Sequence, residues 1–329
     1  MHNLYRGNAG AAALICGALV GALSFTTKSF SQPVQEPSAI ETRIDEAAAA
    51  FGNHPRLKGL SKEQRRSLVQ FVIGNTLFVT VHELGHTVIS EMGLPVLGRE
   101  EDAADAFAAT VALKIGTSFS HQVLIEAAKG WFLADRRDRK EGEALDFYDE
   151  HGLDKQRAYN VVCLMVGSDP VKFKSLADET KLPKERQQSC GGDFGNATWS
   201  WNQVLTPHRR NPEQPKTEIA VVYGDGGKKF SAIASVLRSM NFLEAIAEHA
   251  SEQFLWRKPF ALESATCDGI ANAAWKIEER KIVVCYEIAA EFAELYMRYG
   301  IKQNAHRKQS HVARSTTPKQ SRRSRKARL

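Results

Sequence analysis

Asp and Glu are missing from both ends of this sequence. Residues 1–31 and 302–329 contain neither, whereas they carry two and ten Lys and Arg residues, respectively. The intervening residues, 32–301, hold 32 basic and 38 acidic side chains, so the formal net charge of +6 comes from the ends. A mildly acidic body argues against a nucleic-acid-binding protein, because such proteins meet phosphates with a basic surface.

The sequence also lacks a run of about 20 strongly apolar residues, the length needed to span a bilayer. The nearest approach is "AAALICGALVGALSF", which lies between Arg6 and Lys28 and is followed by small residues up to Ser31. This pattern predicts a signal peptide at residues 1–31 and therefore an exported protein, periplasmic or secreted. An uncleaved N-terminal membrane anchor is the alternative. Ile15 before Cys16 is too large for a lipoprotein cleavage site.

Cysteine is scarce, and the residues after the signal peptide hold only Cys163, Cys190, Cys267 and Cys285. An even number in an exported chain favours two disulfides. Three pairings are open, and we prefer Cys163–Cys190 and Cys267–Cys285 because each closes a short segment. Four buried thiols become the better interpretation if the chain is not exported.

The basic tail, residues 302–329, has no periodic apolar residues. It cannot bury enough apolar surface to repay the entropy of ordering, so we expect it to be disordered. A solvated terminus without a dedicated partner is the simplest interpretation. An anionic envelope surface would suit its charge, and no specific nucleic acid is expected.

The body is predicted to be α+β and dominated by helices. Residues 32–56 should form a linker and a first helix, and residues 57–301 the folded domain, with the cysteine-bearing second half at 150–301. From Thr217 onward, "TEIAVVYGD" and "RKIVVCYEI" predict strands by their Val and Ile content. Glycines and prolines predict that residues 169–211 are rich in turns.

Two helices near the middle of the chain are the best-defined elements. Ser61 and Gln64 form a capping box at the start of a long apolar helix, and Gly93 and Pro95 provide its end. The Ala-rich stretch "GREEDAADAFAATVALKIG" predicts a second helix directly after it, so that the pair spans residues 61–116.

The first of these helices contains "VTVHELGHTV". His82 and His86 are four residues apart, so both imidazoles face the same way and can bind one cation, with Glu83 beside them. The pattern alone also arises by chance. Its place in a helix that is apolar nearly all round favours a metal site, because buried His and Glu side chains need compensating partners.

The second helix supplies a candidate third ligand. Glu101 and Asp105 are again four residues apart, and Glu101 lies fifteen residues beyond His86. Glu101 would bind the metal, and Asp105 would accept a proton from the second nitrogen of a ligand histidine. Glu100 would replace Glu101 if the helix were rotated. A solvated acidic helix start is the alternative, because acids there favour the helix dipole.

Several stretches together resemble a bacterial family identified only as zinc metallopeptidases of unknown substrate: "FVIGNTLFVTVHELGH", "LPVLGREEDAAD", "CLMVGSDP" and "CDGIANAAWKIEERKIVVCYE". The resemblance runs from about Leu57 to Tyr299. More distantly, the helix after Glu101 looks like the third-ligand helix of glutamate-type zincins, which phage-repressor-cleaving peptidases share. The resemblance implies a zincin-like core, one Zn²⁺ held by His82, His86 and Glu101, and Glu83 as general base.

Such a hydrolase needs a donor for the oxyanion of the tetrahedral intermediate. His151, in "DEHGLDKQR", is the first choice because it is polar and near a predicted loop, and Arg157, Tyr223 and Tyr286 are further candidates. Each also has a structural explanation. The substrate would be a peptide or protein.

The competing hypothesis keeps the zinc and drops the chemistry, giving a zinc-stabilised binding or scaffold protein of the cell envelope. Catalysis needs Glu83 and structure does not. An intact Glu83 beside both histidines therefore favours the enzyme.

Overall fold

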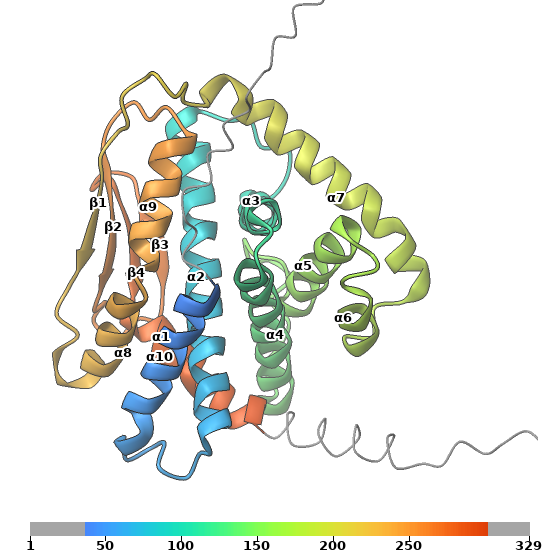
Figure 1. Ribbon diagram of the computed structural model, residues 1–329. Coiled ribbons are helices and arrows are strands. Elements are labelled where there is room, and N and C mark those ends of the chain that lie inside the picture. Colours follow the sequence, from blue (N-terminus) through green and yellow to red (C-terminus); the bar gives the residue numbers. More distant parts are fainter. Residues whose placement is uncertain (1–36, 302–329) are drawn as a thin grey trace, which may run out of the picture. The chain divides into compact units, whose positions relative to one another are not determined.

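The computed structural model describes residues 37–301 (Figure 1). The predicted signal peptide, residues 32–36 of the linker and the basic tail lie outside these described residues. Within them the fold is α+β and dominated by helices, as the sequence predicts, with a four-stranded sheet.

The elements follow one another in two groups. The first group is helical: α1 (Pro37–Ala50), η1 (Phe51–Asn53), α2 (Lys62–Met92), α3 (Glu100–Ile115), α4 (Ser118–Glu141), α5 (Asp154–Ser168), α6 (Lys174–Glu179), α7 (Lys184–Leu205) and η2 (Thr206–His208). The second group is mixed: β1 (Ile219–Tyr223), α8 (Gly227–Met240), α9 (Phe242–Gln253), β2 (Phe260–Ala265), β3 (Ala273–Lys276), β4 (Lys281–Cys285), α10 (Tyr286–Leu295) and η3 (Tyr296–Gly300).

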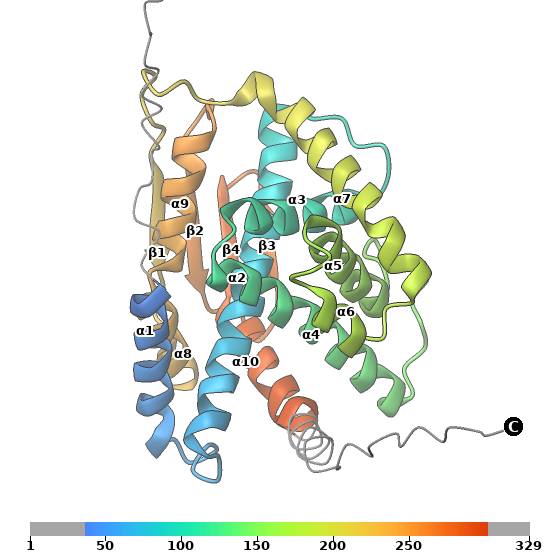
Figure 2. The same cartoon turned by 45° about the vertical axis from the view of Figure 1, so that its right-hand side comes forward.

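Helix α2 lies between the sheet and helices α3 and α4 (Figures 1 and 2). It begins with the capping box, in which the Ser61 side chain accepts from the Gln64 N–H and the Gln64 side chain accepts from the Ser61 N–H. It ends at Gly93, whose φ of 64° suits glycine. By length and composition α2 could cross a membrane, but 72% of its most apolar window is buried inside the protein. It therefore behaves as a core helix.

The sheet has the order β1-β2-β4-β3. Strands β1, β2 and β4 are parallel, whereas β3 is antiparallel to β4 and forms an edge. Leu262 of β2 and Val284 of β4 share one core cluster with Val88 of α2 and Leu243 of α9. Strand β3 contacts α2. The core thus holds an antiparallel edge strand against the central helix.

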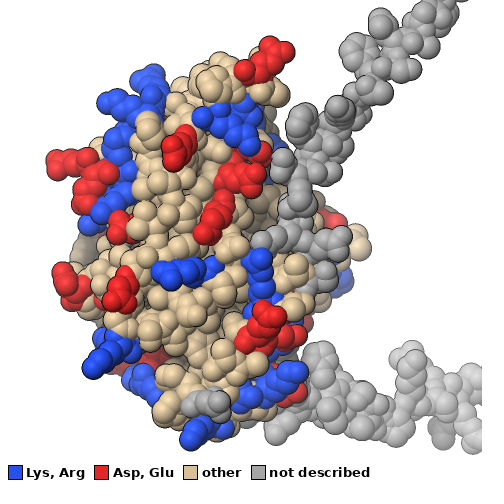
Figure 3. Space-filling model, turned by 60° about the vertical axis from the view of Figure 1, so that its left-hand side comes forward, with Lys and Arg blue, Asp and Glu red and all other residues tan. Residues whose placement is uncertain are grey.

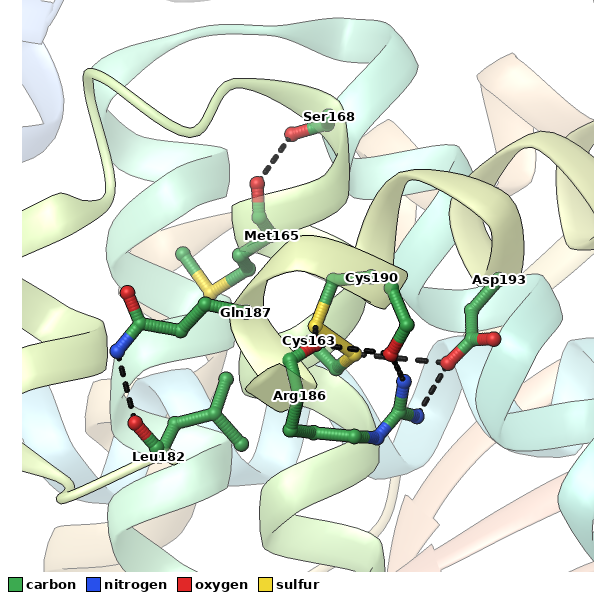
Figure 4. Close-up of a disulfide and its surroundings, with 9 residues drawn as sticks. Cys163, Met165, Ser168, Leu182, Arg186, Gln187, Cys190 and Asp193 are labelled. Carbon is green, nitrogen blue, oxygen red and sulfur yellow. Dashed lines mark hydrogen bonds and ion pairs between the residues drawn. A yellow bond between two sulfur atoms is a disulfide. The ribbon is translucent and has the colours of Figure 1, made fainter. Parts of the chain in front are cut away.

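The expectation of a turn-rich segment at residues 169–211 is wrong, because α6 and the 22-residue α7 occupy much of it. The disulfide between Cys163 and Cys190 joins α5 to α7 (Figure 4). Gly167 allows this approach, since a Cβ there would lie 2.1 Å from the Cys190 carbonyl oxygen. Packing against α5 therefore overrides the low helix propensity of the glycines in α7.

A second disulfide joins Cys267, after β2, to Cys285 at the end of β4. Both disulfides have the pairing that we preferred. The Glu287 carboxylate accepts from the backbone N–H groups of Cys267 and Gly269 and fixes the same loop. Cys267, Cys285 and Glu287 lie close enough together to suggest a metal site. Both sulfurs form the disulfide, however, so neither cysteine offers a thiolate to a metal ion.

Candidate metal centre

Helices α2 and α3 bring the three predicted ligands together. The Nε2 atoms of His82 and His86 are 3.1 Å apart. Between them, Gly85 lets α3 approach, because a Cβ there would lie 3.1 Å from the Cα of Ala104. Glu101, in the first turn of α3, then reaches both rings, with Oε2 3.0 Å from His82 Nε2 and Oε1 3.4 Å from His86 Nε2.

The donor set fits a metal ion. His82 Nδ1 is 2.8 Å from Asp105 Oδ1, and His86 Nδ1 is 2.8 Å from Glu100 Oε1. With the Nδ1 protons directed at these carboxylates, the Nε2 atoms, once deprotonated, would present lone pairs to a metal ion in place of their contacts with Glu101. Ligands at about 2.1 Å from a tetrahedral zinc ion lie about 3.4 Å apart, close to the spacing seen here. Glu101 Oε2 is also buried without a well-aligned hydrogen bond.

The electrostatics of the cluster favour a cation. Burial would lower the pKa of His82, but hydrogen bonds to Asp105 and Glu101 raise it to about 9. Burial would also lower the pKa of His86, and hydrogen bonds to Glu101 and Glu100 raise it. Burial would raise the pKa of Glu101, but the nearby imidazoles of His151, His82 and His86 hold it well below its ordinary value. These carboxylates therefore stabilise positive charge where the Nε2 atoms meet.

Asp105 connects His82 to a buried arginine. Arg157 of α5 donates from Nε to Asp105 Oδ2 and from Nη2 to Oδ1, both at 2.8 Å. The guanidinium carbon lies 3.9 Å from the ring centre of Trp131. Burial would raise the pKa of Asp105, but hydrogen bonds from His82 and Arg157 lower it to about 2. The carboxylate therefore stays ionised and holds the His82 ring in one orientation.

Glu83 lies beside the histidines and faces the sheet. It is buried, and its Oε2 accepts from the backbone N–H of Trp275 on β3 at 3.0 Å. Burial raises the pKa of Glu83, while the charges of His82 and His86 oppose the rise. The carboxylate is thus fixed one residue from a ligand, at the edge of the sheet.

His151 completes the group from the loop before α5. Its Nε2 is 2.9 Å from Glu101 Oε2 and its Nδ1 is 3.0 Å from Asp149 Oδ1, while the side chain is 44% exposed. The other oxyanion candidates are occupied elsewhere. Arg157 binds Asp105, the Tyr223 hydroxyl donates to Glu244, and the Tyr286 hydroxyl donates to the Gly224 carbonyl.

The contacts made by Glu100, Trp131 and Trp275 were not predicted as parts of the site. The sequence predicts Glu100 only as a replacement ligand, whereas its carboxylate contacts His86 Nδ1. Glu100 and Glu101 are adjacent in the sequence, which could have suggested that one binds the metal and the other hydrogen-bonds a histidine ring. The Trp131 and Trp275 contacts join distant parts of the chain and carry no local signal.

A family model described as "Putative metallopeptidase" matches residues 44–205 of this chain. The matched part contains both histidines, Glu83, Glu101 and His151, whereas the sheet lies beyond it. The match supports a metallopeptidase and hence a bound metal ion. No curated protein and no solved structure matches the chain.

Proposed function

We propose that this protein is an exported zinc-dependent metallopeptidase that hydrolyses a peptide or amide bond. The proposal is carried by one observation: two imidazole Nε2 atoms and the Glu101 carboxylate meet within 3.4 Å, with Glu83 buried beside them. The two disulfides support export, because disulfides persist in oxidising compartments.

Each residue has a distinct role in this proposal. His82, His86 and Glu101 would hold one zinc ion, which would acidify the attacking water and polarise the scissile carbonyl. Glu83 takes a proton from the attacking water and passes it to the leaving amine. His151, on the exposed side of the cluster, donates from Nε2 to the oxyanion of the tetrahedral intermediate.

Strand β3 supports a peptide as the substrate. Its Trp275 N–H donates to Glu83 and points away from β4, so the edge of β3 that does not pair with β4 faces the site. In an antiparallel pair, outward-pointing backbone groups recur at every second residue, so Ala273 presents its carbonyl along the same edge. An extended peptide adding to this edge would pass beside Glu83.

The alternative is a closed zinc site that stabilises a binding or scaffold protein. His82, Glu101 and His151 offer donor atoms within 4.8 Å of one another, so His151 is placed near enough to serve as a fourth ligand. Four protein ligands are typical of structural zinc, whereas three leave a position for water. The exposure of His151 favours the enzyme, because a fourth structural ligand is normally enclosed.

Metal content decides whether the centre exists, and we would measure it by mass spectrometry on the chain without residues 1–31. We expect one zinc per chain in the wild type and in Glu83→Gln and His151→Ala, and loss of zinc in Glu101→Ala. Hydrolysis of a peptide library should be lost in Glu83→Gln, because the general base contributes about 10²- to 10⁴-fold. Loss of zinc in His151→Ala would instead support the structural site.

A further inference from the structure

A cavity of about 440 Å³ is lined by residues of α3, the helix that carries Glu101, by residues of α7 and α9, and by Arg209 and Phe254, which follow η2 and α9. This volume is within the range of small-molecule sites. Its walls are mainly apolar and aromatic, with Phe107 and Trp201 in contact at a ring separation of 5.0 Å. The cavity is separate from the proposed reacting groups, because Glu83, Glu101 and His151 do not line it.

The polar part of the lining carries charge of one sign. Lys114, Arg209 and His249 line the cavity, and none of its lining residues is Asp or Glu. Lys114 makes no hydrogen bond or ion pair within residues 37–301. Among the described residues, the Arg209 side chain donates only to neutral amide oxygens, at 3.2 Å to Asn202 and 3.5 Å to Gln253. Two cations therefore share one cavity without a carboxylate.

The protonation behaviour of these bases agrees with that arrangement. Burial lowers the pKa of Lys114, and the nearby charge of Arg209 lowers it further. Burial also lowers the pKa of His249, where Glu252 opposes the effect and Lys114 adds to it. Glu252 is itself paired with Lys216, at 2.7 Å. An anion in the cavity would relieve the repulsion between the cations.

We propose that this cavity binds a small organic anion with an apolar body and a carboxylate head. The aromatic walls would take the apolar body, and Lys114 and Arg209 would bind the carboxylate. The buried Thr198 Oγ1, which lines the cavity and has no hydrogen-bond partner among the described residues, offers a further donor. Lys114 is exposed and Arg209 is half-buried, so both charges lie where an anion can reach them from solvent, and no lining carboxylate competes for them. This site goes beyond the proposed function and does not depend on it.

Phe107 links the cavity to the back of the metal centre. It lines the cavity, and its ring lies 3.3 Å from the position that a Cβ on Gly85 would take, between the two ligand histidines. A bound anion would therefore pack against Phe107, which lies at the contact between α2 and α3. Occupancy should raise the melting temperature, because a ligand that binds only the folded state stabilises it.

The test is titration calorimetry with sodium decanoate on the whole chain without residues 1–31, in zinc-loaded and chelator-treated protein. Decanoate should bind saturably. Decanol, which lacks the carboxylate, and acetate, which lacks the apolar body, should each bind at least about tenfold more weakly. Lys114→Gln and Arg209→Gln should each weaken decanoate binding about tenfold. Lys58→Gln, the same change at an exposed lysine of another surface, should leave it unchanged.

Three results would overturn the proposal: no saturable binding of decanoate, equal binding of decanol, or unchanged affinity in both Lys114→Gln and Arg209→Gln. The melting temperature of each variant without ligand checks that it is folded. Because the readout is heat of binding, the outcome is independent of hydrolysis. A protein that binds decanoate but no zinc would retain this site and lose the proposed function.

Discussion

At the scale of single residues, Asp105 touches both His82 and Arg157, so one carboxylate orients a proposed ligand and neutralises a buried cation. Asp105→Ala should lower zinc affinity about 10- to 100-fold, because the His82 ring loses its fixed orientation. It should also lower the free energy of unfolding by about 3–5 kcal/mol, because Arg157 is left buried and unpaired. Metal-competition titration and denaturant unfolding of the metal-free protein would measure the two effects separately.

Asp45→Ala is the matched control, since Asp45 pairs with Arg66 at 2.9 Å on the surface and its side chain is 49% exposed. Exposed pairs contribute about 1 kcal/mol or less, and this one is distant from the ligands. Equal losses of stability in Asp45→Ala and Asp105→Ala would contradict the role given to the buried pair.

Asp154, at the start of α5, gives a prediction of pH dependence. Burial and the charge of Asp138 raise its pKa from 3.8 to about 6, although Arg157 and Arg137 oppose the rise. The folded state therefore binds the proton more tightly than the unfolded state, so this stabilisation is complete below about pH 4 and is lost as the pH rises through 6. Asp154→Asn should remove that loss.

The expected gain for Asp154→Asn is about 1–2 kcal/mol at pH 7.5, after allowance for partial exposure. Urea unfolding of wild type and variant between pH 4 and pH 7.5 would show it as a difference that grows with pH. A difference that stays constant over this range would mean that Asp154 ionises normally in the fold.

The sequence predicts the residues of the proposed site that share a helix, and it does so from spacing. His82 with His86, and Glu101 with Asp105, are four apart, and helix geometry alone places each pair on one face. The Glu83–Trp275 contact joins residues 192 positions apart. Only the packing of β3 on α2 creates that contact, so no local pattern could have predicted it.

At the scale of elements, the sequence predicts a helix end correctly where it carries an explicit capping signal. Helix α2 begins and ends where its capping box and Gly93 predict. No such signal marks the break between α8 and α9, where Asn241 adopts a φ of 53°. Asn tolerates this conformation, but its presence in a helical pattern does not require it.

A glycine in α5, Gly167, gives a prediction about the position of helix α7. Gly167→Ala in α5 would place a Cβ 2.1 Å from the backbone oxygen of Cys190, which a side-chain rotation cannot relieve. Helix α7 must then shift, and we expect a loss of about 1–3 kcal/mol or more in the free energy of unfolding.

Gly191→Ala in α7 makes the same chemical change where nothing lies within 4 Å. This variant should gain about 0.5–1 kcal/mol, because alanine favours a helix interior over glycine. Denaturant unfolding of the two variants should therefore give shifts of opposite sign. A stabilised Gly167→Ala variant would contradict the close packing of α5 on α7.

At the scale of the whole molecule, the proposed centre needs both halves of the described chain. The family match covers α2, α3 and His151. Strand β3, whose Trp275 N–H donates to Glu83, lies outside residues 44–205. Basic and acidic side chains are intermixed on the face shown in Figure 3. The body therefore has no broad basic patch on that face. The sequence places most of the excess positive charge in residues 302–329.

This distribution of charge predicts that the tail carries any attraction to an anionic envelope surface. Removing residues 302–329 should abolish binding to vesicles containing phosphatidylglycerol, because each Lys or Arg near such a surface contributes about 1 kcal/mol and the tail holds ten of them. Vesicle co-sedimentation at rising salt would measure this, and the binding of the longer chain should weaken as salt screens the charges. Zinc content should stay unchanged, because none of the proposed ligands lies in residues 302–329. Equal vesicle binding by the shortened chain would place the attraction in the body, and salt-sensitive binding to duplex DNA alone would favour a nucleic-acid partner for the tail.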